Sequence, residues 1–351
     1  MKELLAIFIG LTLSLFLFGW IYAGAKRAKG QPILEYAPRP PVPWGLIHLF
    51  VFGFLMIGIQ SFLASYWGVD LKSEDADVLG ASQENMLFAS GASRLLTVPI
   101  IFGAIMLMSR GTLTDLGIVP RKIHRDVLVG VSAFAMIAPI VFGLQLLLTK
   151  FFKSQHPLIE WLTERPTMFF LYMVAFSAVV VAPIAEEVLF RLLLQGWFEK
   201  IALRKFSGRE LVFGQSEVGL NDFSAPLTEP KKDSADGKDG PNATHGKESG
   251  NPFQPPLTQQ PAKLVTDKGE VYDDGRLPSG IAMLPILGSS LVFALMHYSH
   301  GPDPIPLFLL SLGIGYVYQR THRILPCILI HMLLNGFSMV LLWLQLFGGK
   351  S

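Results

Sequence analysis

The chain has 351 residues, of which 51% are hydrophobic and only 16% are charged, whereas about 25% of the residues in an ordinary soluble protein are charged. The 29 Lys and Arg nearly balance the 27 Asp and Glu, and a net charge of +2 with no basic stripe excludes a nucleic-acid partner. The single cysteine, Cys327, excludes an intramolecular disulfide and a cysteine-based metal site. This composition indicates an integral membrane protein.

Apolar runs of about 20 residues are typical of membrane-spanning helices, and the chain has eight candidates. Lys26, Arg27 and Lys29 follow the first run, the reverse of the charge order in a signal peptide, so we expect a retained helix. The sequence therefore predicts an all-α polytopic transmembrane bundle of about eight spans. The expected spans are Leu4–Ala23, Trp44–Trp67, Leu95–Met108, Val127–Leu148, Met168–Phe198, Ile281–His297, Ile305–Tyr318 and Ile324–Phe347.

The charges between the spans predict an orientation in the membrane. Basic residues in short loops mark the cytoplasmic side, and they follow the first and third spans and precede the eighth. The loop 68–93 is acidic instead. We therefore expect both termini outside and the long segment after the fifth span in the cytoplasm. The membrane would be the plasma (inner) membrane if the source is bacterial.

The segment 204–278 is a polar insertion that holds 22 of the 56 charged residues. Its central part, 224–262, has almost no large apolar side chain, so burial cannot offset the entropy of ordering it. We expect this insertion to be largely disordered, and it is a candidate arm for binding a protein partner.

The fifth span carries three charges within six positions, at Glu186, Glu187 and Arg191. Each would cost about 2.5–3.5 kcal/mol at the centre of a lipid-facing helix, so such residues are candidates for function. Glu187 and Arg191 are four apart and share a helix face, which favours an ion pair. Glu186 points about 100° away and stays free to act as a general base. A purely structural ion pair would leave Glu186 unexplained.

Two later spans add polar side chains of the same kind. His297 ends the sixth span, and His331 and Asn335 are four apart on one face of the eighth. Each feature alone is also consistent with an interior hydrogen bond. Together with Glu186 they form a set sufficient to activate water: Glu186 to accept the proton, two imidazoles to hold the water or a metal, and Asn335 to donate to an oxyanion.

The motifs Glu186-Glu187-x-x-x-Arg191, Phe293-x-x-x-His297 and His331-x-x-x-Asn335 resemble the signature of the CAAX protease and bacteriocin-processing family of intramembrane endopeptidases. The resemblance covers about 116–347, including a segment around Gly117. It implies a core formed by 116–203 and 279–347, with 1–115 as additional spans.

The resemblance also implies a role for each matching residue. Glu186 activates water, Asn335 supports the oxyanion, and Glu187 with Arg191 stabilises the site. His297 and His331 contact the water or a metal, for which the resemblance implies zinc. The HExxH motif of zincins is absent.

These observations favour an intramembrane endopeptidase that hydrolyses a peptide bond of a membrane-anchored peptide or protein, with a prenylated CAAX tail as one candidate. A non-proteolytic membrane scaffold or bacteriocin-immunity protein is the alternative, and an ion or proton transporter is a second one. Replacing Glu186 discriminates among them, because a scaffold should tolerate the change.

Four other polar residues lie in or near the first four spans without motif spacing. We interpret them as packing or interfacial residues. They are His48, Gln60, Arg94 and Gln145.

Overall fold

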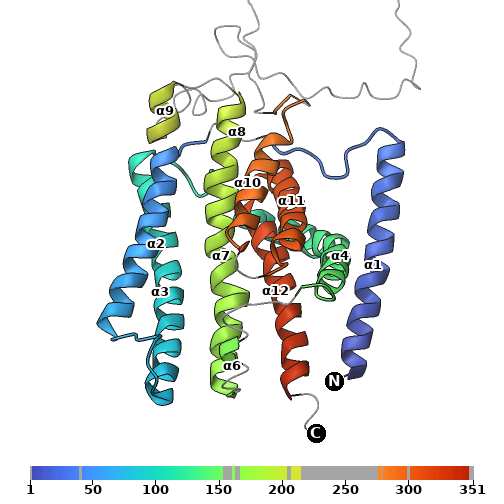
Figure 1. Ribbon diagram of the computed structural model, residues 1–351. Helices are drawn as coiled ribbons and strands as arrows, with labels where there is room; N and C mark the ends of the chain where they lie inside the picture. The colour runs from blue at the N-terminus through green and yellow to red at the C-terminus, as the bar shows by residue number, and fades with distance from the viewer. Residues whose placement is uncertain are drawn as a thin grey trace, which may run out of the picture. The chain divides into compact units, whose positions relative to one another are not determined.

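The computed structural model describes residues 2–38, 42–152, 160–162, 167–203, 207–214, 276–278, 280–298 and 301–347, and within these residues every regular element is helical. Residues 1–216 and 275–351 form one compact unit, and 217–274 form another, which lies outside the described residues. The expectation of disorder in the insertion therefore stays a prediction. The predicted all-α fold class is confirmed (Figure 1).

Each of the eight expected spans corresponds to helical structure. Six segments are long and apolar enough to cross a membrane. The helices that match the expected spans are α1 (Lys2–Ala28), α2 (Leu46–Tyr66), α3 (Ala76–Met108), α4 (Ile123–Leu148), the fifth span (Met168–Leu203), α10 (Leu284–Leu295), α11 (Pro304–Thr321) and α12 (Ile324–Phe347).

The third span is much longer than expected, because α3 begins at Ala76 and not at Leu95. Asp75 caps its first turn, since the Asp75 carboxylate accepts hydrogen bonds from the backbone N–H groups of Asp77 and Val78. The prediction of a loop throughout 68–93 was therefore wrong. Polar side chains of the added turns, such as Gln83, are buried against neighbouring helices, so the low hydropathy of this stretch did not reveal the helix.

The fifth span is a continuous helix with two π-helical stretches. Its parts are α6 (Met168–Phe176), η2 (Ser177–Val181), α7 (Ala182–Glu187), η3 (Val188–Gln195) and α8 (Gly196–Leu203), of which η2 and η3 are π-helical. π-Helical turns are rare and occur frequently at functional sites. The two stretches lie on either side of α7, which carries both glutamates.

The helix of the sixth expected span is short. With 12 residues, α10 is about 18 Å long, against a hydrocarbon core of about 30 Å. It packs against α11, which has 18 residues and ends three positions before α12 begins. The two helices therefore form a helical hairpin.

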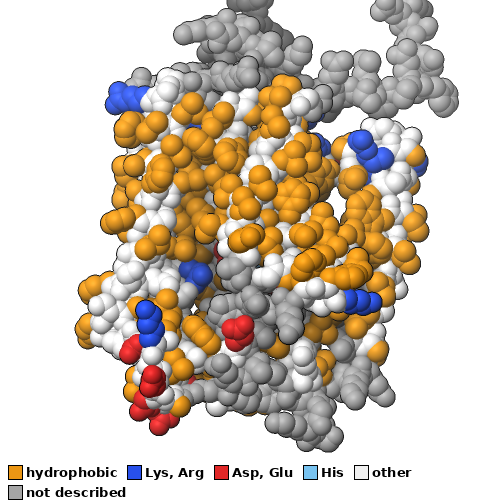
Figure 2. All heavy atoms as spheres, in the orientation of Figure 1, with side chains coloured by type: hydrophobic (Ala, Val, Ile, Leu, Met, Phe, Trp, Pro, Cys, Tyr) orange, Lys and Arg blue, Asp and Glu red, His pale blue; other side chains and the backbone are white. Residues whose placement is uncertain are grey.

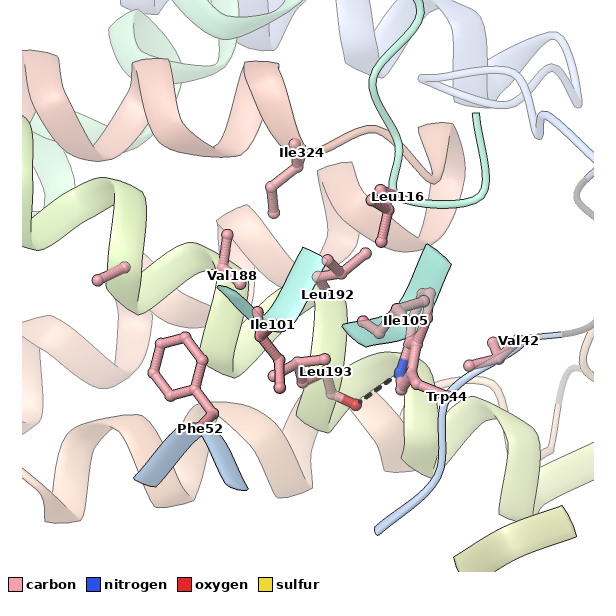
Figure 3. Packing of buried hydrophobic residues seen from close by; sticks show 11 residues of the cluster. Val42, Trp44, Phe52, Ile101, Ile105, Leu116, Val188, Leu192, Leu193 and Ile324 are labelled. Carbon is pink, nitrogen blue, oxygen red and sulfur yellow. Dashed lines mark hydrogen bonds between the residues drawn. The ribbon is translucent and has the colours of Figure 1, made fainter. Parts of the chain in front are cut away.

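An apolar cluster joins the N-terminal helices to the fifth span (Figure 3). Trp44 is fully buried there, and its indole N–H donates to the Leu193 carbonyl at 3.1 Å. Gly196 gives the ring room, because a Cβ atom at this position would lie 2.7 Å from Trp44 Cζ2. Nearby, Lys200 Nζ donates to the backbone carbonyls of Val42, Trp44 and Glu210 at 2.9, 3.3 and 3.1 Å.

Two shorter segments connect the helices at the same end of this unit. Gly117, part of the segment included in the family resemblance, lies in a turn with φ +73°, and its carbonyl accepts from the backbone N–H of Ile324. The helix α9 (Gly208–Phe213) lies inside the expected polar insertion, and Leu211 accepts a hydrogen bond from Trp197. The first residues of the expected insertion thus pack on the membrane unit.

The helix directions agree with the predicted topology. In Figure 1, α1 begins and α12 ends on one side, whereas α8 ends and α10 begins on the other. Figure 2 shows hydrophobic side chains over most of the visible face, with Asp and Glu gathered at the lower end of α2 and α3. Together with the six apolar helices, this arrangement identifies an integral membrane protein.

Candidate active site

The two adjacent glutamates on α7 have different environments. Glu187 is fully buried, and its Oε2 atom accepts a hydrogen bond from Arg191 Nε at 3.1 Å. The ion pair expected from the spacing of four residues is therefore present. The side chain of Glu186 is 22% exposed and makes no ion pair with Arg191. One carboxylate is thus neutralised and held, and the other faces a more open space.

Two other helices hold the buried guanidinium of Arg191 in place. Arg191 Nη1 donates to Ser289 Oγ of α10 at 3.3 Å, and Nη2 donates to Ser311 Oγ of α11 at 2.6 Å. The guanidinium also lies 5.7 Å from the ring centroid of Phe293. A buried charge is stable only when it is paired and hydrogen-bonded, and these contacts satisfy that condition.

His331 connects α12 to both glutamates. Its Nδ1 atom lies 2.8 Å from Glu187 Oε1, and its Nε2 atom lies 3.9 Å from Glu186 Oε2. A carboxylate accepts hydrogen bonds, so Glu187 fixes the tautomer with the proton on Nδ1. Nε2 is then an acceptor that faces the exposed carboxylate of Glu186. A polar separation of this length suits a bridging water molecule.

His297 lies at the end of α10, next to the same group of aromatic and imidazole rings. Its Nδ1 atom is 2.8 Å from the Phe293 carbonyl, and its ring centroid is 4.9 Å from that of Phe293. The Phe293 ring also contacts the His331 ring edge-on, with 5.8 Å between the ring centroids. The short α10 explains this geometry: the helix ends at the depth of His331 instead of continuing across the membrane.

Asn335 lies one turn beyond His331 on α12 and binds the π-helical stretch η2. Its Nδ2 atom donates to the Ala178 carbonyl at 2.8 Å. One of the two N–H groups of the amide is used in this contact. The hydrogen bond fixes the amide between the outer part of the fifth span and the imidazole of His331.

The structure thus brings Glu186, Glu187, Arg191 and His331 into direct contact distances, with His297 joined through Phe293 and Asn335 one turn away. Their catalytic roles stay predictions.

Sequence reasoning missed the neutral residues that support Arg191. Ser289 and Ser311 bind the guanidinium, and Gln195 accepts from Ser289 Oγ at 3.4 Å and donates to Glu199 at 3.2 Å. Serines are common in membrane helices, and only the spacing of four from Arg191 to Gln195 and on to Glu199 offered a signal.

The residues that could bind a zinc ion here are His297, His331 and Glu186. Two imidazoles and a carboxylate are donor types that zinc accepts. Among the described residues, however, no group of three His, Cys, Asp or Glu is arranged to hold a metal ion. Zinc at His297 and His331 therefore remains an expectation from the resemblance, and the mechanism proposed below includes no metal step.

A comparison with protein families supports the resemblance. Residues 274–337 match the family model described as Type II CAAX prenyl endopeptidase Rce1-like. The matched residues include His297, His331 and Asn335, whereas Glu186 precedes them in the sequence. The match confirms the resemblance to the CAAX protease family. No match was found among curated proteins or among solved structures.

Proposed function

We propose that this chain, a membrane protein whose residues 274–337 match the Rce1-like CAAX endopeptidases, is an intramembrane endopeptidase. One observation carries the proposal. His331 is held by the buried Glu187, and its second nitrogen faces the partly exposed Glu186 at 3.9 Å. A structural ion pair would need only Glu187 and Arg191, whereas a water-activating site needs this additional pair of acceptors.

In the proposed mechanism, a water molecule donates its two protons toward Glu186 Oε2 and His331 Nε2. Its oxygen attacks the carbonyl carbon of the scissile peptide bond as Glu186 takes one proton. The resulting tetrahedral intermediate carries a negative charge on the former carbonyl oxygen. Glu186 then returns the proton to the amide nitrogen, the C–N bond breaks, and a carboxylic acid and an amine are released.

The oxyanion requires donors that are already in position. The second N–H of Asn335 is the candidate, because Asn335 lies one turn from His331 on α12. His297, whose Nδ1 atom faces the Phe293 carbonyl, is proposed to contact the water. Glu187, Arg191 and the two serines act as positioning residues, since they hold His331 without facing the water.

The proposed substrate is a membrane-anchored peptide or protein, and a prenylated CAAX tail is one candidate that the family match suggests. The proposed location is the plasma (inner) membrane if the source is bacterial. We also propose that residues 204–278 bind a protein partner on the cytoplasmic side, because this polar segment leaves the bundle next to α8 and α10.

The test compares the peptide termini in membranes of the native host. Cells would carry wild-type protein, Glu186→Gln or the matched control Glu74→Gln, which changes an exposed glutamate outside the spans, all at equal expression. We expect specific new termini with the wild type and the control, and their loss with Glu186→Gln. Unchanged termini, together with rescue of a deletion phenotype by Glu186→Gln, would refute proteolysis and favour the scaffold.

A further inference from the structure

The helix α3 carries one basic residue, Arg94, deep in the membrane. Within the part of the chain that the structure describes, its side chain makes a hydrogen bond to Ser90 and no ion pair. The contact of Gln60 with Met86 gives the register of α2 against α3, and Arg94 lies eight residues further along α3. This places Arg94 level with about Phe52, roughly 21 Å before the end of α2 at Tyr66.

Of the two roles expected from the sequence, packing or interfacial, the position of Arg94 well inside α3 fits the packing one. The other three residues interpreted in the same way do have packing partners. Gln60 contacts Met86, Gln145 donates to Asp303 at 2.7 Å, and His48 accepts from the backbone N–H of Gly45 at 3.2 Å. An arginine at this depth is costly and marks a functional position by default.

The direction of Arg94 follows from its neighbours on α3. Leu87, Arg94 and Ile101 are seven residues apart and share one helix face. Leu87 packs in the cluster that contains Val174, and Ile101 packs in the cluster that contains Ala185. Arg94 thus faces the fifth span between these two clusters, at the level of the π-helical stretch η2.

The backbone next to Arg94 is unobstructed. A Cβ atom added at Gly91, one turn before Arg94 on α3, would meet no atom within 4 Å. Arg94 itself is half-buried. Between the two apolar clusters, α3 thus carries a half-buried cation and, one turn earlier, a residue without a side chain; we call this stretch of α3 the gap.

The gap adjoins the candidate active site. Asn335 binds the Ala178 carbonyl within η2, and Glu186 follows Ala185, whose cluster includes Ile101. The seven residues from Arg94 to Ile101 correspond to about 10 Å along the helix axis. About three extended peptide residues cover that distance.

We propose that Arg94 binds a carboxylate of the peptide substrate, about three residues from the scissile bond. A guanidinium is suited to this task because it forms two parallel hydrogen bonds to a carboxylate. Desolvation of the gap by the substrate strengthens this contact. The inference rests on the proposed function, since it names the group by which that site selects its substrate.

The test measures binding separately from cleavage. Full-length Glu186→Gln protein in lipid nanodiscs would be titrated with fluorescent peptides that have a prenylated cysteine followed by three apolar residues. The peptides end in a free acid, in an amide, or in an amide that follows an added Asp. We expect the acid to bind at least tenfold more tightly than the plain amide. If the Asp peptide binds as tightly as the acid, the site accepts a side-chain carboxylate. If it binds as weakly as the plain amide, the site requires the terminal carboxylate.

Substitutions then test Arg94 itself. In the same background, Arg94→Gln should bring the acid and amide affinities within twofold of each other, whereas Arg94→Lys should retain part of the preference. Arg125→Gln, which removes a guanidinium that is 57% exposed and lies outside the gap, should keep the tenfold preference. Ser90→Ala, a milder change, should reduce the preference a few fold if Arg94→Gln does not fold.

Equal binding of acid and amide by the parent protein, or a preference that survives Arg94→Gln, would overturn the inference. Its failure is distinguishable from failure of the proposed function. If wild-type protein cleaves none of the peptides but binds the acid through Arg94, the endopeptidase is refuted and the carboxylate site stands. If wild-type protein cleaves the peptides but shows no preference for the acid, the endopeptidase stands and the carboxylate site at Arg94 is refuted.

Discussion

Replacing Glu187 by glutamine tests whether the buried ion pair holds the site together. The substitution removes the charge that neutralises Arg191, which is fully buried, and weakens the contact of 2.8 Å to His331. Breaking one partner of a buried pair costs about 3–5 kcal/mol, because the remaining charge is left uncompensated. Glu186→Gln is the matched comparison. Glu186 is 22% exposed and unpaired with Arg191, so we expect a loss below about 0.5 kcal/mol.

The single cysteine provides the assay, because Cys327 is fully buried and reacts only when the bundle opens. A loss of about 3 kcal/mol raises the fraction of open molecules by roughly a hundredfold. Labelling of Cys327 by a maleimide dye should therefore be about a hundredfold faster in Glu187→Gln, and within a factor of about two of the wild type in Glu186→Gln. Labelling of Glu187→Gln at the wild-type rate would refute the reasoning, and Cys327→Ala controls for background.

Three further predictions use the same labelling assay. Lys200→Met leaves three backbone carbonyls without their donor and should destabilise the fold by about 3 kcal/mol; an unchanged rate would contradict this role. Gly117→Ala should cost at least about 1–2 kcal/mol, because φ is +73° and the new Cβ atom would lie 2.8 Å from the His322 carbonyl, whereas Gly103→Ala, in open space, should be harmless. Deletion of 217–274 should leave labelling unchanged, because the three apolar clusters lie in the other unit; faster labelling would show that these residues stabilise it.

The sequence predicted the helices correctly where nearly all of their residues are apolar. The eighth span, Ile324–Phe347, has the expected bounds because its mostly apolar run contains no Asp, Glu, Lys or Arg. The start of α3 was missed because polar side chains such as Gln83 face other helices there, and hydropathy does not distinguish burial in protein from exposure to water. The expected sixth span, Ile281–His297, was only slightly too long, because α10 covers Leu284–Leu295.

The candidate site was predicted to a similar degree. Spacing alone predicted the Glu187–Arg191 pair, because the helix geometry fixes which residues share a face. It did not predict that His331 would contact both glutamates, because that depends on how α12 packs against α7. The role of Ser289 could not be predicted for the same reason, because it depends on α10 placing this hydroxyl against the Arg191 guanidinium.

The site is divided along the chain at the long insertion, which has a consequence for how the molecule can be assembled. A break within 217–274 would leave the two carboxylates and Arg191 on the first fragment, and His297, His331 and Asn335 on the second. Neither fragment alone has both the carboxylates and the imidazoles of the candidate site. Under the proposed function, two separately synthesised polypeptides would therefore be inert until they associate in the bilayer, and recovery of cleavage on co-expression would report their association.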